Sequence, residues 1–141
     1  MKKVLIGGVF DLIHLGHIKA LKKAREYGDY LIVNVSSDER VRLKKGIGRP
    51  ILPATDRAQI VAELKFVDKV VLYAGEIEPN HFKAIREEKP DILIMDDNEH
   101  QDLSKEEKVC QELGIKLIRM PRVITESELD TTRIIDKIKL I

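Results

Sequence analysis

Short apolar runs alternate with segments of helical character along this chain, and that alternation restricts the fold more than any other feature. The strands that we predict are short and mostly apolar, and they lie at 2–7, 30–35, 69–73, 91–95 and 115–119. The helices that we predict between and after them lie at 15–27, 56–65, 79–88, 104–113 and from 130 or 131 onward. Buried strands separated by helices are typical of a parallel sheet. The sequence therefore predicts a single α/β domain over residues 1–141, with a five-stranded parallel sheet and helices on both faces.

Local signals place the helix boundaries. Thr55 is expected to cap the helix at 56–65, and Ser104 with Glu107 is expected to form a capping box for a helix that Gly114 ends. Residues 42–53 contain four cations, two glycines and two prolines, so we expect a loop there.

Composition narrows the classes of partner. The chain has 141 residues, 43% apolar and 35% charged, with a net charge of +1, which is the balance of one globular domain. So small a net charge gives no overall field that would attract nucleic acid or a membrane surface. Lys2 and Lys3 precede only a short strand, and no stretch is long enough to span a bilayer, so we expect a cytoplasmic protein. The single cysteine, Cys110, has no partner for an internal disulfide, and packing is its expected role, ahead of a redox role.

The first predicted strand leads into a glycine turn and then into two histidines. Gly7 and Gly8 permit positive φ and close approach of the backbone to a ligand. His14 and His17 are three residues apart at the start of a helix, so they point the same way, and that helix end favours an anion. A His-x-x-His pair could also bind a metal, but no third ligand has convincing spacing. In a Rossmann-like sheet of this kind, ligands bind beyond the carboxyl ends of the strands, where this turn belongs.

Each part of this stretch has an ordinary structural explanation, but the whole string is far more specific. Gly-x-Phe-Asp-x-x-His-x-Gly-His, read from Gly8 to His17 after a strand, resembles the signature of the cytidylyltransferase-like nucleotidyltransferase superfamily. The chain looks most similar to glycerol-3-phosphate cytidylyltransferases, over nearly its full length. The run 28–33 resembles their second strand, and 95–97 resembles their Met-Gly-Asp-Asp turn without its glycine. Residues 120–135 resemble their last motif with a longer spacer.

The resemblance implies transfer of a nucleoside monophosphate from a triphosphate to a small phosphorylated acceptor, with release of pyrophosphate. The favoured interpretation is CMP transfer from CTP to an acceptor such as glycerol 3-phosphate. One alternative is an ATP-dependent adenylyltransferase acting on a sugar phosphate, FMN or phosphopantetheine, and another is a non-catalytic nucleotide-binding sensor. Mg²⁺ is expected to arrive with the triphosphate rather than on a metal site of the protein. The resemblance also implies a homodimer, with no nucleic acid or membrane partner.

The resemblance assigns roles to particular residues. His14 and His17 are expected to donate hydrogen bonds to the α-phosphate and to the leaving oxygen. Lys44 and Lys45 are expected to close over the β- and γ-phosphates, and Arg122 to clamp a phosphate with its fork of donors. The nucleotide-binding residues that the resemblance implies are Gly7, Gly8, Val9, Phe10, Asp11, Gly16, Lys45, Arg57, Asp96, Thr131 and Thr132.

Several of these residues have a competing structural explanation. The lysines could belong to a solvated loop, Arg57 could lie on a helix surface, and Thr131 and Thr132 could simply cap a helix. Residues 96–98 could form a solvated turn. Asp11 is more suited to orienting the turn or a histidine than to binding a metal.

Asp130 stands where the resembling family has a serine. A carboxylate 4 Å from a phosphate charge would be repelled by about 4 kcal/mol at an effective dielectric constant near 20. We therefore expect Asp130 to turn away and cap the last helix, or to pair with Arg133 or Arg122. His81 and His100 lie outside the motifs and are expected at the surface.

Overall fold

The computed structural model describes residues 1–98 and 101–141. Its strands are β1 (Lys3–Gly8), β2 (Tyr30–Val35), β3 (Lys69–Leu72), β4 (Ile92–Asp96) and β5 (Lys116–Met120). Its helices are α1 (Leu15–Arg25), α2 (Asp38–Lys45), α3 (Ala54–Ala62), α4 (Asn80–Glu88), α5 (Ser104–Leu113) and α6 (Thr131–Lys139).

The strands form one parallel sheet in the order β3-β2-β1-β4-β5. In its register, Leu5 of β1 lies opposite Ile32 of β2 and Leu93 of β4. The predicted Rossmann-like, five-stranded parallel sheet is therefore confirmed. The order reverses at β1, because the chain builds outward to β3 on one side and then to β5 on the other. The crevice at the carboxyl end of β1 is where such sheets bind ligands.

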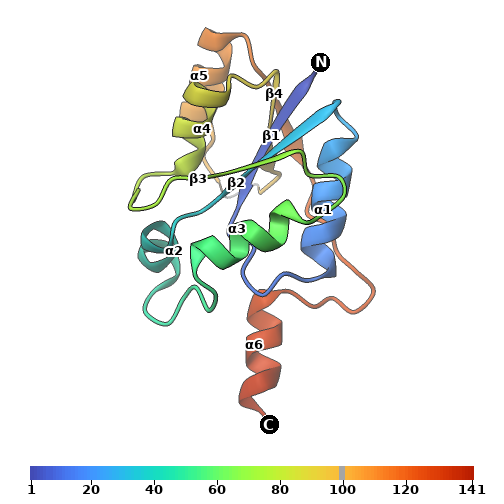
Figure 1. The fold of residues 1–141 in the computed structure, drawn as a ribbon, viewed down its shortest axis with the longest axis vertical. Helices are drawn as coiled ribbons and strands as arrows, with labels where there is room; N and C mark the ends of the chain where they lie inside the picture. Colours follow the sequence, from blue (N-terminus) through green and yellow to red (C-terminus); the bar gives the residue numbers. More distant parts are fainter. Residues whose placement is uncertain (99–100) are drawn as a thin grey trace.

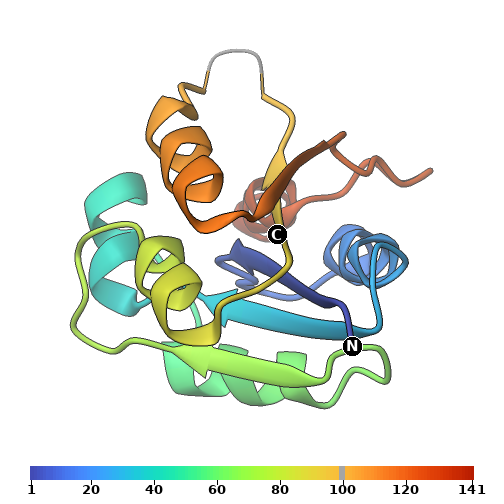
Figure 2. The same ribbon diagram turned by 90° about the horizontal axis from the view of Figure 1, so that it is seen from above.

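Helices cover both faces of this sheet, as Figure 2 shows. On one face, Leu21 of α1 and Val61 of α3 pack with Val33 of the sheet. On the other face, Ile85 of α4 and Cys110 of α5 pack in a second buried cluster. Cys110 is thus a packed core residue, as predicted.

The last helix, α6, projects from the body of the molecule (Figure 1). Its first residue is tied to the turn after β1, because the Thr131 hydroxyl donates a 2.7 Å hydrogen bond to the Asp11 carbonyl oxygen. Asp130 is its N-cap, as predicted, and accepts a hydrogen bond from the Arg133 amide at 2.8 Å.

Two helix starts differ from the predictions. Thr55 does not cap α3, because Pro53 occupies the N-cap position without a side-chain hydrogen bond. The predicted capping box of Ser104 and Glu107 is also wrong, because the N-cap is Leu103, which is buried. Burial of that leucine fixes the chain's entry into α5.

The predicted loop at 42–53 begins later than expected. Residues 42–45 form the last turn of α2, whose N-cap is Ser37 and which ends at Gly46 with φ +91°. Acidic residues in its first turn and basic ones in its last turn complement the helix dipole. Lys44 and Lys45 therefore project from a helix end rather than from a loop.

Candidate active site

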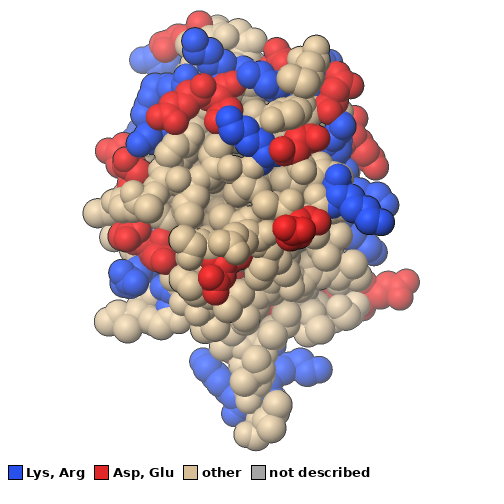
Figure 3. All heavy atoms as spheres, in the orientation of Figure 1, with Lys and Arg blue, Asp and Glu red and all other residues tan. Residues whose placement is uncertain are grey.

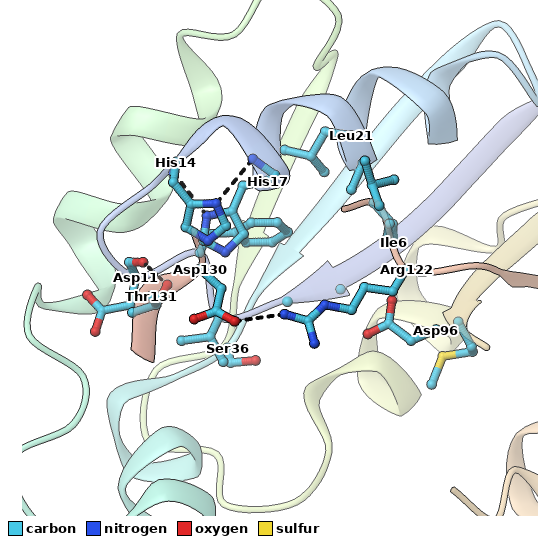
Figure 4. Close-up of a pocket in the computed structure, with 18 of the residues that line it drawn as sticks. Ile6, Asp11, His14, His17, Leu21, Ser36, Asp96, Arg122, Asp130 and Thr131 are labelled. Carbon is cyan, nitrogen blue, oxygen red and sulfur yellow. Dashed lines mark hydrogen bonds and ion pairs between the residues drawn. The ribbon is translucent and has the colours of Figure 1, made fainter. Parts of the chain in front are cut away.

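A cavity of about 850 Å³ opens at the carboxyl edge of the sheet. It is walled by the turn after β1, the start of α1, the end of α2, the starts of α4 and α6, and the segments after β4 and β5; Figure 4 shows part of it. The predicted site residues that line this cavity are Gly7, Gly8, Val9, Phe10, Asp11, His14, Gly16, His17, Lys44, Lys45, Asp96, Arg122, Thr131 and Thr132. The structure therefore brings together nearly all of the residues that the motifs single out.

His14 and His17 form the N-terminal cap of α1 themselves. Nδ1 of His14 accepts a hydrogen bond from the Gly16 amide at 3.1 Å, and Nδ1 of His17 accepts one from the His14 amide at 3.2 Å. The two rings are stacked, with centroids 3.7 Å apart, so the side chains do point the same way. A ring nitrogen that accepts from an amide carries no proton, so a neutral imidazole here holds its proton on Nε2. Each histidine thus keeps one N–H donor for a ligand.

Gly16 leaves room for this arrangement. A Cβ at position 16 would come within 2.9 Å of Cε1 of His14, which no side chain allows. Glycine is needed here for space around the imidazole ring, rather than for a special backbone angle.

The turn before the histidines does not use its glycines for positive φ, although they permit it. Positive φ falls on Phe10 (+56°) and Leu12 (+48°) and not on Gly7 or Gly8. A Cβ at position 8 would lie 2.7 Å from the Phe10 ring, which meets the His17 ring edge-on with centroids 5.5 Å apart. Gly8 thus makes room for the aromatic ring that supports His17.

Both histidines are neutral near pH 7. Burial, followed by the charges of His14 and Lys45, lowers the pKa of His17 to about 4. Burial is also the main cause that lowers the pKa of His14, with Arg122 adding to it and Asp130 opposing it. Both rings can therefore donate hydrogen bonds from Nε2–H while they are neutral.

These shifts predict how pH affects activity and stability. We expect kcat/KM to stay flat as the pH falls from about 8 to below 6.5, and to drop as His17 gains a proton on Nδ1 near pH 4. Protonation there removes the acceptor for the His14 amide. In the unfolded chain, the pKa of His17 returns to about 6.5. Between these values the unfolded state binds a proton that the folded state does not, so the free energy of unfolding falls as the pH falls.

Urea unfolding at a series of pH values measures this effect, with His17→Gln as the control. The glutamine amide oxygen can still accept from the His14 amide, but it does not titrate. The variant should lose less stability than the parent across the same range. An NMR titration of His17 with a midpoint near 6.5 in the folded protein would contradict the expectation.

Arg57 does not reach the cavity. It is fully buried, and its guanidinium donates to the Val9 carbonyl at 2.7 Å, to the Leu52 carbonyl at 2.9 Å and to Asp38 at 2.7 Å. The predicted contact with nucleotide is thus replaced by a structural one. Arg57 ties the turn after β1 to the start of α2 and to the segment before α3.

Asp11 orients a loop rather than a histidine. Its two carboxylate oxygens accept hydrogen bonds from the amides of Ile51 at 2.6 Å and Leu52 at 2.9 Å. These two bonds hold the segment after α2 against the turn after β1.

The end of α2 and the segment after it supply a group of cations. Burial, with the neighbouring charges of Arg49 and Lys44, lowers the pKa of Lys45. Arg49 also lines the cavity, and its buried Nε and Nη2 atoms have no hydrogen-bond partner among the described residues. Arg49 is one of the four cations of the predicted loop and is not among the predicted site residues. Buried guanidinium donors without partners are unfavourable, and a phosphate can satisfy them with two hydrogen bonds.

Arg122 and Asp130 form an ion pair at the cavity, with Nη2 and Oδ2 2.8 Å apart (Figure 4). The predicted capping and pairing of Asp130 are confirmed, but its side chain lines the cavity instead of turning away. Asp96 lies near them, and enclosure raises its pKa while Arg122 opposes the shift. Of the two threonines, Thr131 donates its hydroxyl hydrogen bond to the Asp11 carbonyl oxygen, whereas Thr132 is exposed and lines the cavity.

His81 is not a surface residue, contrary to the prediction. It is half-buried at the cavity wall, and its Nε2 lies 3.1 Å from Oε1 of Glu106. Neither residue was assigned to the site, because they are far apart in the sequence and belong to no motif. His100 lies outside the described residues.

Among residues 1–98 and 101–141, no group of three or more His, Cys, Asp or Glu side chains could hold a metal ion. No helix in this part of the chain combines the length and apolar character that crossing a bilayer requires. On the face in Figure 3, basic and acidic side chains are interspersed.

Several known proteins are similar to this chain along most of its length. The FAD synthase of Pyrococcus abyssi is 38% identical over 138 residues, which cover 96% of this chain and 91% of that protein. The bifunctional protein HldE of Desulfatibacillum aliphaticivorans is 37% identical over 138 residues, which cover 98% of this chain but 27% of that protein. The crystal structure of the lipopolysaccharide core biosynthesis protein from Thermoplasma volcanium superposes with a TM-score of 0.74 and 35% identity, over 87% of this chain and 98% of that one.

These relatives replace one part of the predicted resemblance. The relatives reported above are an FAD synthase and HldE, rather than the glycerol-3-phosphate cytidylyltransferases that the motifs predict. The superfamily itself is confirmed, because the Cytidylyltransferase-like family matches residues 5–137. This chain therefore belongs to the Cytidylyltransferase-like family and is a nucleotidyltransferase.

Proposed function

We propose that this enzyme transfers AMP from ATP to FMN, forming FAD and pyrophosphate. The observation that carries the proposal is the 38% identity to an FAD synthase across 96% of this chain and 91% of that protein. CMP transfer to glycerol 3-phosphate, which the motifs alone favour, has no such support among these relatives.

In the proposed reaction, a phosphate oxygen of FMN attacks the α-phosphorus of ATP. The bond from that phosphorus to the bridging oxygen breaks, and the leaving oxygen departs in line as pyrophosphate. The attacking phosphate is already ionised near pH 7, so no general base is required. The transition state gathers negative charge on its oxygens, and donors fixed in advance stabilise it. The neutral Nε2–H groups of His14 and His17 fit that role, because their caps fix both rings.

The cations of the cavity fit the remaining phosphate charge. Lys44, Lys45 and Arg49 lie at the α2 side, and Arg122 lies near His14 with the amide end of α6. Mg²⁺ is proposed to enter as a complex with ATP, keeping most of its waters and bound chiefly by phosphate oxygens. Thr132 can add a hydroxyl donor at the start of α6.

A matrix of donors and acceptors tests this function. ATP and CTP are each incubated with FMN, a sugar 1-phosphate or glycerol 3-phosphate, and pyrophosphate release is measured together with the FAD formed. We expect release to require Mg²⁺, ATP and FMN. A clear preference for CTP, or a lack of FAD, would overturn the proposal.

A second candidate is an adenylyltransferase acting on a sugar phosphate. It is favoured by the 35% identity to the Thermoplasma volcanium protein, which is described as a lipopolysaccharide core biosynthesis protein. The same matrix separates the two, because this candidate releases pyrophosphate with the sugar phosphate and not with FMN. Nucleotide binding without turnover on any acceptor would instead favour a sensor.

We also propose a homodimer, as the family resemblance implies. The projecting helix α6 leaves Ile138 and Leu140 exposed, and such apolar side chains gain from a covering surface. Light scattering at micromolar concentration checks this, and a monomer would contradict it.

A further inference from the structure

His81 and Glu106 form a buried pair at the cavity wall. His81 is in the first turn of α4 and Glu106 in the first turn of α5, and both line the cavity that holds the histidine pair. Nε2 of His81 lies 3.1 Å from Oε1 of Glu106. Glu106 is only 7% exposed.

One oxygen of this buried carboxylate lacks a donor. Oε2 of Glu106 has no hydrogen-bond partner among the described residues. Burial is the main cause that lowers the pKa of His81, so its ring is neutral near pH 7. A neutral ring that donates from Nε2 satisfies Oε1 and has no second N–H on that side. A buried carboxylate oxygen is unfavourable without a donor, so this position favours a ligand that brings one.

The neighbouring polar side chains make other hydrogen bonds, and none of their N–H groups reaches Oε2 of Glu106 in the part of the chain that the structure describes. The Asn80 amide donates to the Glu78 carbonyl and accepts from the Ser37 amide. Arg40 donates to the Ile77 carbonyl.

The pair lies at the end of the cavity that adjoins α2. The charges of Arg40 and Lys44 contribute to lowering the pKa of His81, whereas Arg122 and Asp130 act on His14. In-line transfer requires the attacking and leaving oxygens on opposite sides of the α-phosphorus, so the two substrates extend in opposite directions. The amide end of α6 and Arg122 suit the strongly charged triphosphate, and the acceptor then extends toward α4 and α5. The cations at the end of α2 lie between these two ends, because Asp130 acts on the pKa of Lys45 and Lys44 acts on that of His81, so they can meet phosphate charge of both substrates.

We propose that Glu106, held by His81, accepts a hydrogen bond from a neutral donor of the acceptor substrate and so selects that substrate. The inference rests on the proposed function, because FMN carries suitable donors in its ribityl hydroxyls and in the imide N–H of its ring.

The test compares Glu106→Gln with Glu107→Gln. The glutamine at 106 keeps the shape, but once its oxygen accepts from His81 it presents an NH₂ group where the ligand also has a donor. We expect KM for FMN to rise roughly ten-fold, as for loss of a hydrogen bond to a charged group, with KM for ATP unchanged and kcat little changed. The dissociation constant of FMN alone, followed by flavin fluorescence, should rise in parallel. Glu107 is the matched control, because its exposed side chain pairs with Arg119 and does not line the cavity.

N3-methyl-FMN distinguishes the two sources of the donor. If the imide N–H is the group, the methylated acceptor makes wild type and Glu106→Gln alike; if a hydroxyl is the group, the difference between them persists. A rise in KM for ATP, or a change in thermal stability with no change in KM for FMN, would overturn the inference.

If the wild-type enzyme makes no FAD, the proposed function is wrong, and this result is independent of the inference about Glu106. The same KM comparison is then made with the acceptor that the matrix identifies. An acceptor KM that Glu106→Gln leaves unchanged would overturn the inference there too.

Discussion

Replacing His14 or His17 with alanine is expected to lower kcat by roughly 10²–10³, the usual loss for one preorganised donor to a transition-state oxygen. Each imidazole offers one Nε2–H from a ring that its own cap bond holds in place. The substrates are also held by cations elsewhere in the cavity, so KM for the nucleotide should change far less. Steady-state kinetics with saturating acceptor measures both quantities.

The control for this experiment separates catalysis from capping. Alanine at His14 also removes the N-cap of α1, which costs about 1 kcal/mol of stability. Asparagine caps well and can accept from the Gly16 amide, and glutamine at His17 can accept from the His14 amide. His14→Asn and His17→Gln should therefore recover thermal stability without recovering kcat. If either variant restores full turnover, the histidine serves the helix and not the reaction.

Arg49→Met is expected to lower kcat/KM by about 100-fold, or about 2.7 kcal/mol, a loss in the range of hydrogen bonds to a charged group. Its buried Nε and Nη2 atoms have no partner among the described residues and need an anion. The same substitution should not lower the free energy of unfolding of the unliganded protein. Removing two buried N–H groups that lack partners should leave the stability to urea unchanged or higher.

Arg42→Met provides the matched control. Arg42 is an exposed cation of the same segment and does not line the cavity, so its loss should leave kcat/KM within about two-fold. A substantial loss of stability in Arg49→Met, with kinetics unchanged, would show that Arg49 supports the fold alone.

The centre of the sheet could be predicted because β1, β2 and β4 are largely buried and therefore read as apolar runs. The ends of the helices were harder. Thr55 has the composition of a cap, yet the chain enters α3 through Pro53, and α5 begins where burial of Leu103 fixes the backbone. Those starts depend on contacts distant in sequence, which a local pattern does not record.

Site residues within a local motif could likewise be predicted, whereas those that depend on tertiary contacts could not. The motif found His14 and His17 because their spacing and neighbours are local. It placed Arg57 at the nucleotide and left out Arg49, although both are cations near one loop. What separates them is tertiary: the Val9 carbonyl and Asp38 converge on Arg57, while Nε and Nη2 of Arg49 have no partner among the residues that the structure describes. Glu106 and His81 meet only once α4 and α5 have packed on the sheet.

The histidine cap closes through bonds that span no more than three residues, from His14 to Gly16 and to His17. The far end of the cavity is assembled instead from the starts of separate helices. Substitutions accumulating on those helices during evolution can exchange one acceptor for another while the transfer step stays intact. A lineage can thus diversify its substrates by drift at the periphery, with the reactive stretch inherited unchanged.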